Sequence, residues 1–308
     1  MKVVALAGGV GAAKFLSGLI EIVPPEDLTI IVNTGDDFQW MDLYICPDLD
    51  TVTYALAGLS NPDTGWGVQG DTFRCLERLQ RLGGESWFRI GDLDLATHLL
   101  RTHRLRNGCS LSEVTAEICA RNGIRCRILP MTNSPVPTLV HTSEGVLAFQ
   151  EYFVRRRCEP VVQGFTFEGV EQSQPAPGIM EALASSDTII VCPSNPFISI
   201  GPILAVPGIR EAVRHAEATV VAVSPVVGGQ AIKGPTAAML GQLGHEVSAA
   251  GVAAMYADIL DTFILDIRDE ALRCRVLDLG LAVRTAETIM NSEPARMSLA
   301  RMVMEMVL

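Results

Sequence analysis

The sequence has no long uninterrupted hydrophobic run, and this lack excludes one class of protein at once. No segment of the 308 residues approaches the roughly 18 consecutive apolar residues that a membrane-spanning helix needs. Lys2 and the apolar residues after it resemble the start of a secretory signal, but Gly8 and Gly9 interrupt the run before any cleavage site. We therefore expect a cytoplasmic protein with no membrane partner.

Charged residues are also scarce, and most of them are acidic. Asp, Glu, Lys and Arg make up 19% of the chain, the formal net charge is −11, and hydrophobic residues reach 48%. Such a chain can bury a sizeable core in one large α/β domain or two smaller ones. Because nucleic-acid binding is driven mainly by Lys and Arg on phosphates, we expect no nucleic-acid partner. A small anion can still bind, since screening lets local charges decide.

The eight cysteines lack any metal-binding spacing. No two of them are arranged as Cys-x-x-Cys, and no cluster of histidines accompanies them. The pattern therefore excludes the common zinc and iron–sulfur sites. Scattered cysteines in an apolar chain are typical of reduced, buried residues.

What the sequence does contain begins with a glycine turn. Residues 3–7 are a short apolar run, and helical spacing of apolar residues starts at Phe15. This pattern predicts a strand, a tight turn and a helix whose free N–H groups form an anion site. The turn contains four candidate residues for binding a nucleotide phosphate: Gly8, Gly9, Gly11 and Lys14.

The turn does not match either of the two common nucleotide motifs. Lys14 stands where the dinucleotide fingerprint has its third glycine, and Phe15 replaces the Ser or Thr of a Walker motif. The motif alone therefore indicates a nucleotide or phosphate site without specifying the ligand. A purely structural glycine turn remains an alternative.

A second buried strand, residues 28–33, is followed by acidic residues. Together with the first strand and helix it predicts a βαβ unit and a parallel sheet. The end of this strand is where a Rossmann-type protein places the residue that binds a ribose hydroxyl. Asn33, Asp36 and Asp37 are the candidates, and a plain turn is the alternative.

Two further carboxylates lie at Asp48 and Asp50. If this segment is extended, both point to the same side. They could then hold Mg²⁺, which prefers oxygen ligands. The alternative is that one of them caps a helix that runs to Ala57 and is ended by Gly58.

Residues 61–175 lack the alternation of buried strands and helices seen before them. We expect them to form a mainly helical insertion that covers the nucleotide domain. The spacing predicts helices over 72–82, 95–103 and 110–121, the last with a capping box completed by Glu113. Asp92 or Asp94 is expected to cap the second of these helices. His98 and His103 lack a metal-ligand spacing and are expected to be packing or surface residues. Residues 139–153 and 164–170 are predicted to be strands.

The α/β pattern then returns. Buried strands are predicted over 188–192, 219–223 and 262–267, and the first two run into loops of proline and small residues. In a parallel sheet these loops lie on the same rim as residues 8–14, which places Ser194 and Asn195 near the glycine turn. We therefore predict a Rossmann-like parallel sheet with helices on both faces. Residues 1–60 and 176–308 would form this nucleotide-binding domain, and 61–175 the insertion.

Several segments, in order and over nearly the whole chain, resemble the 2-phospho-L-lactate transferases (CofD-like family) of deazaflavin coenzyme F-420 biosynthesis. These segments are GGVGAAK (8–14), NTGDD (33–37), PDLDT (47–51), GDTF (70–73), RIGDLDLATHLLR (89–101), LPMTNSPV (129–136), PSNPFISIGPIL (193–204) and SPVVGGQAIKGP (224–235).

The resemblance implies a reaction. A guanosine diphosphate that carries phospholactate, or its enolpyruvate counterpart, donates the phospho-acid group to the ribityl hydroxyl of the deazaflavin Fo, and GMP leaves. The family places Asp50 and Arg89 against the deazaflavin and implies a Mg²⁺ requirement. We also predict a homodimer.

These implications give each candidate residue a role. The four residues of the glycine turn would bind the diphosphate. Asn33, Ser194 and Asn195 would line the nucleotide cleft. Asp48 and Asp50 would hold Mg²⁺ or orient the attacking hydroxyl, and Arg89 would hold the acceptor or the developing charge.

Two other functions remain alternatives. A related, non-catalytic group has the same Rossmann core and binds nucleotide-sugars as a regulator, although PDLDT and RIGDLD favour the transferase. An NAD-dependent dehydrogenase is a weaker alternative, because the third glycine of the fingerprint is missing.

Overall fold

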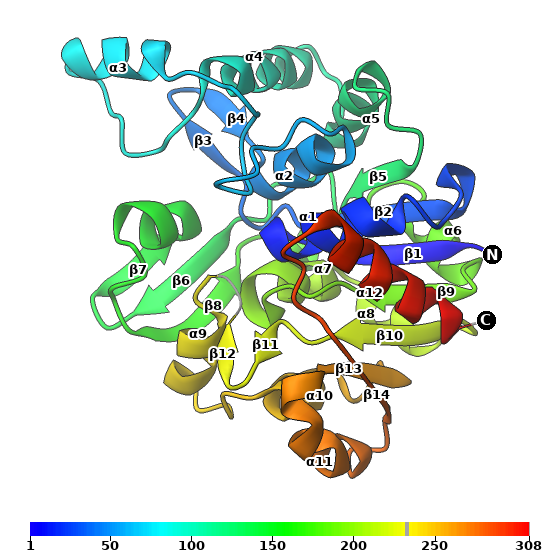
Figure 1. Cartoon of the computed structure of the whole chain (residues 1–308). Coiled ribbons are helices and arrows are strands. Elements are labelled where there is room, and N and C mark those ends of the chain that lie inside the picture. The colour runs from blue at the N-terminus through cyan, green and yellow to red at the C-terminus, as the bar shows by residue number, and fades with distance from the viewer. Residues whose placement is uncertain (232–233, 308) are drawn as a thin grey trace.

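The centre of the computed structural model, which describes residues 1–231 and 234–307, is a seven-stranded sheet whose strands are all parallel (Figure 1). From one edge to the other the strands are β14 (Ala282–Ala286), β13 (Thr262–Asp266), β10 (Thr219–Val223), β9 (Thr188–Val191), β1 (Val3–Ala7), β2 (Leu28–Val32) and β5 (Arg127–Pro130). This confirms the predicted Rossmann-like α/β class.

The strands alternate their side chains between two separate hydrophobic cores. In β1, Val4 and Leu6 belong to one core, while Val3, Ala5 and Ala7 belong to the other. Because both faces of the sheet are buried, these strands read as continuous apolar runs.

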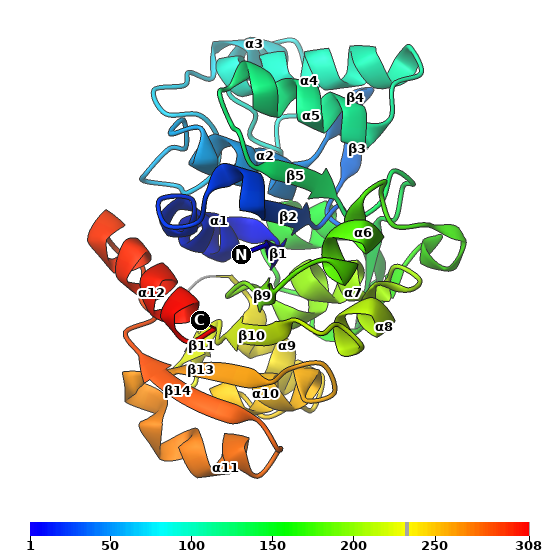
Figure 2. The same ribbon diagram turned by 90° about the vertical axis from the view of Figure 1, so that its right-hand side faces the viewer.

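Helices cover both faces, as Figure 2 shows. Four helices pack on the face of Val3: α1 (Gly9–Leu19), α2 (Pro47–Leu56), α5 (Leu111–Arg121) and α12 (Glu293–Glu305). The face of Val4 is covered by α6 (Ile179–Ala184), α7 (Gly201–Ala205), α8 (Ile209–Arg214), α9 (Thr236–Gln242), α10 (Ala249–Tyr256) and α11 (Arg273–Leu277).

The strand order reverses between β1 and β9. The chain passes from β1 outward to β2 and β5, and later from β9 outward through β10, β13 and β14. In open parallel sheets, ligands bind outside the carboxyl ends of the strands at such a reversal point. The loops after Ala7 and Val191 therefore mark the expected binding cleft.

The region between β2 and β9 has two additions to the core sheet. A hairpin of β3 (Phe38–Trp40) and β4 (Leu43–Ile45) packs with α3 (Arg74–Arg81) and α4 (Asp92–Arg106), and α3 projects outward at the cyan end (Figure 1). A separate antiparallel sheet has the order β7 (Gly145–Ala148), β6 (Thr138–Thr142) and β8 (Val162–Phe167). β5 lies within the range 61–175 expected to be an insertion, yet it pairs with β2 in the central sheet.

Local expectations in this region were met in part. The capping box of α5 is present, with the Ser110 hydroxyl accepting from the Glu113 amide. The predicted cap of α4 was wrong, because Gly91 occupies the N-cap position and neither Asp92 nor Asp94 does. The predicted strand 139–153 is two strands joined by a turn, followed by the π-helical turn Glu151–Arg155.

Short elements complete the chain. The hairpin β11 (Val226–Val227) and β12 (Gln230–Ala231) falls in the segment 224–235, of which residues 232 and 233 lie outside the described structure. A second π-helical turn is Pro196–Ile200, and 3₁₀ turns occupy Pro25–Asp27, Val170–Gln172 and Ile267–Leu272. Within the described ranges, every helix is too short or too polar to cross a membrane.

Candidate functional site

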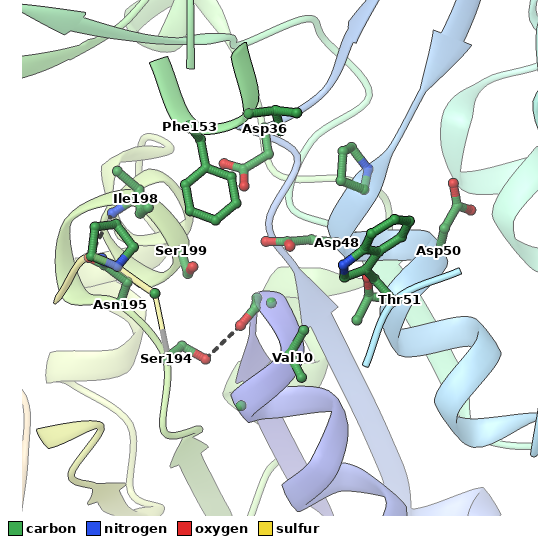
Figure 3. Close-up of a pocket in the computed structure, with 18 of the residues that line it drawn as sticks. Val10, Asp36, Asp48, Asp50, Thr51, Phe153, Ser194, Asn195, Ile198 and Ser199 are labelled. Atoms are coloured by element: carbon green, nitrogen blue, oxygen red, sulfur yellow. Dashed lines mark hydrogen bonds between the residues drawn. The ribbon is translucent and has the colours of Figure 1, made fainter. Parts of the chain in front are cut away.

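A cavity of about 760 Å³ opens at the reversal point of the sheet. Its walls come from the turn after β1, the start of α2, the segment before α4, and the loop after β9. Figure 3 shows Asp36 and Asp48 pointing into this cavity between the start of α1 and the turn that carries Ser199. The volume lies in the upper part of the range typical of small-molecule sites, about 300–1,000 Å³.

The glycine turn is shaped so that α1 begins at the floor of the cavity. Gly9 has φ +70°, a left-handed conformation that side chains with a Cβ rarely adopt. A Cβ on Gly11 would lie 2.2 Å from the carbonyl oxygen of Pro193, so only glycine lets α1 approach the loop after β9. Gly8 is the N-cap and makes no side-chain cap bond. The amide of Gly9 contacts Asp48, and the next amides at the start of α1 are left to bind an anion.

Lys14 also lines the cavity and adds a cation beside the turn. Partial burial lowers the pKa of its ammonium group, and the neighbouring Arg296 lowers it further. A bound anion would reverse this effect, because it favours the charged form of lysine.

Asn33 holds two carboxylates next to each other. Its amide nitrogen lies 3.1 Å from Asp36 Oδ1 and 2.9 Å from Asp48 Oδ2, and it also reaches the carbonyl of Ile198. Its Oδ1 accepts from the Gly35 amide at 2.8 Å. Asn33 is fully buried and does not itself line the cavity, so it acts on the site by orienting Asp36 and Asp48.

The carboxylates of Asp36 and Asp48 repel each other when both are charged. Burial raises the pKa of Asp48 to about 6, although the amides of Asn33 and Gly9 favour its charged form. Burial, and then the charge of Asp48, raises the pKa of Asp36 well above its ordinary value. A divalent cation between them would remove both penalties, and oxygen-only donors suit Mg²⁺.

Asp50 is turned away from this pair and is bound by a buried arginine. Both terminal nitrogens of Arg101, from α4, donate to the two oxygens of Asp50, one of them at 3.0 Å. Both residues are nine-tenths or more buried. The possibility that Asp48 or Asp50 caps α2 was wrong, because Cys46 is the N-cap and both aspartates lie within the first turn.

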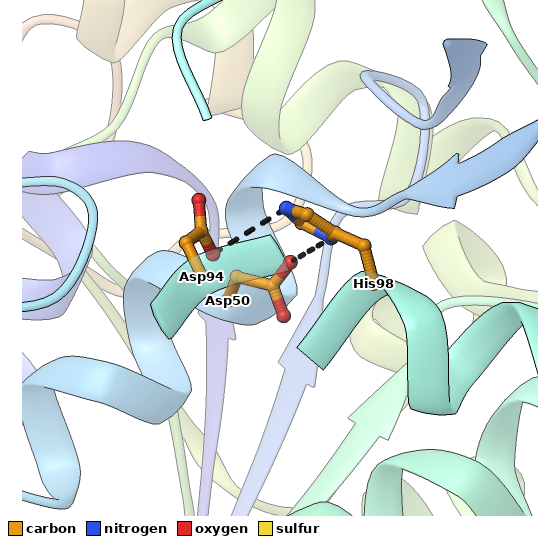
Figure 4. A group of neighbouring side chains, drawn as sticks. All are labelled: Asp50, Asp94 and His98. Atoms are coloured by element: carbon orange, nitrogen blue, oxygen red, sulfur yellow. Dashed lines mark ion pairs between the residues drawn. The ribbon is translucent and has the colours of Figure 1, made fainter. Parts of the chain in front are cut away.

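His98 lies between Asp50 and another carboxylate, that of Asp94, as Figure 4 shows. Its Nδ1 lies 3.6 Å from Asp50 and its Nε2 lies 3.4 Å from Asp94, which also accepts from the Tyr54 hydroxyl at 2.7 Å. Burial alone would raise the pKa of Asp94, but its bonds with His98 and Tyr54 outweigh this and lower it. His98 was expected to be a packing or surface residue, and it instead lines the cavity.

Asp50, Asp94 and His98 are also arranged closely enough to ligate a cation, with their ligand atoms within 4.8 Å of one another. The guanidinium of Arg101 opposes that use, since it already neutralises Asp50. The pair Asp36 and Asp48 has no such cation within hydrogen-bond reach among the described contacts, so it is the better candidate for a metal.

Aromatic side chains line several sides of the cavity, and Trp87 and Phe88, which contact each other edge to face, form an aromatic wall next to Arg89. The other aromatic residues that line the cavity are Tyr54, Trp66, Phe149 and Phe153. Phe149 and Phe153 are stacked with ring centroids 5.4 Å apart. The wall of Trp87 and Phe88 suits a flat, heteroaromatic ligand. The exposed Arg89 adds a positive charge at the edge of this wall.

The structure brings nearly all of the residues selected from the sequence to one cavity: Gly8, Gly9, Gly11, Lys14, Asp48, Asp50, Arg89, Ser194 and Asn195. Ser194 and Asn195 also make hydrogen bonds that shape the walls of the cavity. Ser194 donates to the Gly8 carbonyl at 2.8 Å, and Asn195 accepts from the amide of Phe197 at 2.9 Å.

Sequence reasoning missed Arg101 and the role of His98. Asp94, His98 and Arg101 follow the i, i+4, i+7 spacing of a single helix face, and this was the signal that could have identified them.

This chain is similar to known proteins over nearly its whole length. A family model described as 2-phospho-L-lactate transferase CofD matches residues 3–291. The chain is 40% identical over 299 residues to a 2-phospho-L-lactate transferase of Methanosarcina mazei, covering 97% of this chain and 98% of that one. It is 43% identical over 312 residues to a phosphoenolpyruvate transferase of Streptomyces griseus, covering 99% and 98%.

A solved structure has the same fold. The crystal structure of a UPF0052 family member from Bacillus halodurans superposes with a TM-score of 0.66 at 18% identity, covering 99% of this chain and all of that chain. At this identity the likeness concerns the fold alone.

Proposed function

Because this chain belongs to the 2-phospho-L-lactate transferase CofD family and is therefore a transferase, we propose that it acts on the deazaflavin Fo. The donor is a guanosine diphosphate whose outer phosphate is esterified to lactate or enolpyruvate, so that it consists of GMP joined to the phospho-acid. The oxygen of the terminal ribityl hydroxyl attacks the phosphorus that carries the three-carbon acid, and a new P–O bond forms. The bond to the bridging oxygen breaks, and GMP leaves. This reaction belongs to coenzyme F-420 biosynthesis.

One observation carries the proposal. A single cavity contains the free N-terminus of α1, a pair of carboxylates, and an aromatic wall with Arg89 at its edge. These features match the three parts of the reaction, which are a diphosphate, a cation that neutralises it, and a flat acceptor.

The donor set fits Mg²⁺. Asp36 and Asp48 both accept a hydrogen bond from the side-chain amide of Asn33. Both are buried, and the pKa of each carboxyl is raised. The sequence predicted Asp48 and Asp50 as the metal ligands. We propose Asp48 and Asp36 instead, because both oxygens of Asp50 accept hydrogen bonds from Arg101. When bound there, Mg²⁺ would neutralise the diphosphate oxygens as charge develops on the leaving phosphate.

The chain's own groups have separate tasks. The first amides of α1 and Lys14 bind the diphosphate, and Ser194 and Asn195 hold the turn and the loop that face it. A helix N-terminus contributes only about 0.3–2 kcal/mol, whereas enzymes lower such barriers by about 8–23 kcal/mol. Most of the lowering of the barrier must therefore come from orienting the two bound substrates, which can contribute about 7–11 kcal/mol.

Asp50 and Arg89 serve the acceptor. Asp50 is rigid because Arg101 binds both of its oxygens, so it can hold the ribityl hydroxyl in one orientation. Arg89 provides the positive charge beside the aromatic wall, either for the acceptor or for the developing negative charge. We keep the homodimer as a prediction.

The direct test is an incubation of the protein with Fo, Mg²⁺ and each of the two donors. We expect a new phosphodiester adduct of Fo and one equivalent of GMP, both identified by mass spectrometry. A donor without the three-carbon acid, GDP itself, serves as the control and should give no adduct. Binding of nucleotide without binding or conversion of Fo would contradict the proposal and favour the regulatory alternative.

A second prediction concerns the metal. We expect MgCl₂ to raise the unfolding temperature of the EDTA-treated protein, with or without GDP, because it binds only the folded carboxylate pair; saturation at about 100 times Kd corresponds to about 2.7 kcal/mol. Asp48→Asn should remove this shift, whereas Asp63→Asn, an exposed residue of the loop after α2, should keep it. If Mg²⁺ leaves the wild-type unfolding temperature unchanged in both conditions, the assignment of Asp36 and Asp48 is wrong.

A further inference from the structure

Two segments singled out from the sequence, GDTF (70–73) and RIGDLD (89–94), bind each other through exchanged helix caps. Asp71 accepts hydrogen bonds from the backbone amides of Leu93 at 2.8 Å and Asp94 at 3.0 Å, which are the first amides of α4. Asp92 in turn accepts from the amides of Arg74 at 3.1 Å and Cys75 at 3.0 Å, which begin α3. The segment before α3 therefore caps α4, and the first residue of α4 caps α3.

Further contacts close the connection between the two segments. The amide of Asp92 donates to the carbonyl of Thr72 at 2.8 Å, and the hydroxyl of Thr72 donates to Asp92. A Cβ on Gly91 would lie 2.0 Å from Asp71 Oδ2, so the segment before α4 can approach this closely only with glycine. These hydrogen bonds fix where α4 begins relative to residues 71–73.

Arg89 lies between the ring of Phe73 and the glycine, Gly91, that packs against Asp71. It lies two positions before Gly91, and its guanidinium carbon lies 4.4 Å from the centre of the Phe73 ring, a cation–π contact. The next residue, Ile90, is buried in the small core with Trp40 and Ile45. Arg89 itself is exposed at the cavity and makes no salt bridge among the described residues, so Phe73 and the exchanged caps define its position.

An ordinary capping role does not account for this arrangement. A cap normally comes from the residue next to the helix, as Ser110 does for α5. Here the carboxylates come from positions 17 to 23 residues away. The small core in which Leu76 and Leu79 of α3 pack contains no residue of the central sheet, so the connection is not part of the main core. Its evident effect is on Arg89, the first residue of the second segment, which faces the cavity.

We propose that Asp71, Asp92 and Phe73 are positioning residues that hold Arg89 at the acceptor side of the cavity. The proposal rests on the proposed function, which assigns Arg89 to the acceptor or to the charge that develops in the reaction. It adds three residues that do not bind the substrate, and it accounts for the GDTF segment, which otherwise has no part in the site.

The test is a double-mutant cycle between Asp71 and Arg89, read as KM for Fo and kcat in the transfer assay. Asp71→Ala should raise KM for Fo or lower kcat by about tenfold, within the range of couplings between residues of one network. Asp71→Asn, which keeps an acceptor oxygen for capping, should recover most of the loss. In the Arg89→Leu background, Asp71→Ala should have almost no additional effect.

Phe73 offers a matched pair of variants. Phe73→Tyr keeps the aromatic face under Arg89 and should retain activity, whereas Phe73→Leu should reproduce the defect of Asp71→Ala. Asp63→Ala, an exposed acid of the same loop, should change neither parameter. If Asp71→Ala causes the same loss with and without Arg89, the residue has only a structural role and the proposal is overturned.

A readout that does not need activity separates this proposal from the proposed function. Hydrogen exchange of the backbone amides in residues 86–94 should become faster in Asp71→Ala, while exchange in α5 stays unchanged. Failure of the wild-type protein to bind or convert Fo would overturn the proposed function and this role for Arg89. Unchanged exchange in Asp71→Ala would overturn the connection between the two segments even in an active enzyme.

Discussion

Replacing Asp48 with asparagine is expected to remove most of the transferase activity and at the same time to stabilise the ligand-free protein above pH 6. Asp48 is a buried carboxylate beside Asp36, and burial raises its pKa from 3.8 to about 6. Loss of a metal ligand should cost at least about 10³-fold in kcat, since a metal supplies several kcal/mol of charge stabilisation.

The gain in stability follows from the sign of the pKa shift. Because the folded pKa lies above the unfolded value, protonation of Asp48 favours the native state, and that contribution is lost as the pH rises through about 6. Asparagine stays neutral at every pH, so the variant loses no stability as the pH rises through this range. A shift of about 2 pKa units corresponds to an upper limit of about 3 kcal/mol, and we expect about 1–3 kcal/mol.

Chemical denaturation of both proteins between pH 4 and pH 8 measures this difference. The variant should be more stable above about pH 6, and the two curves should approach each other toward pH 4, where the folded carboxyl is neutral and the unfolded one, with its ordinary pKa of 3.8, is losing its charge. Asp63→Asn, at an exposed position, is the control and should show no such divergence. A variant that is less stable than the wild type at pH 8 would contradict the expected cost of burying the charged form of Asp48.

The central strands could be predicted from the sequence because they are buried on both faces. The runs at β1, β2, β9, β10 and β13 contain almost nothing but apolar residues, and all five were expected. The two strands that were missed, β5 and β14, are the edges of the sheet. β14 alternates exposed and buried residues, and β5 starts with an exposed arginine, so neither forms a continuous apolar run.

The site could be predicted where it depends on neighbours in the chain. The glycine turn and the PDLDT segment each have a local pattern, and both line the cavity. The contacts of Asp50 were not predictable, because Arg101 lies 51 positions away and pairing at that distance leaves no local pattern in a single sequence. Asn33 was expected to line the nucleotide cleft, but its position directly after β2 places its amide under Asp36 and Asp48.

The pairing of Asp50 with Arg101 changes how Asp50 should be tested. Sequence reasoning favours Asp50→Asn as a variant that loses turnover with an intact fold. In the structure this substitution leaves the guanidinium of Arg101 buried without its charged partner. A loss of activity in Asp50→Asn would therefore combine a chemical defect with a structural one, and the two must be separated by variants of Arg101.

Arg101→Met is expected to destabilise the protein by about 3–5 kcal/mol, because it leaves the carboxylate of Asp50 buried and unpaired. For a chain of this size the unfolding temperature should fall on the order of 10 °C. Arg104→Met provides the matched control on the same helix. Arg104 pairs with Glu117 at a partly exposed position, and such pairs are worth about 0–1 kcal/mol.

The double variant Asp50→Asn/Arg101→Met should recover much of the lost stability, because it removes both buried charges together. It should remain inactive, since the acceptor side still lacks its carboxylate. Denaturant unfolding of the four proteins in this cycle gives the coupling between the two residues. If Arg101→Met costs no more than Arg104→Met, Asp50 is adequately solvated without its partner. The rigidity on which its proposed role depends would then have another source.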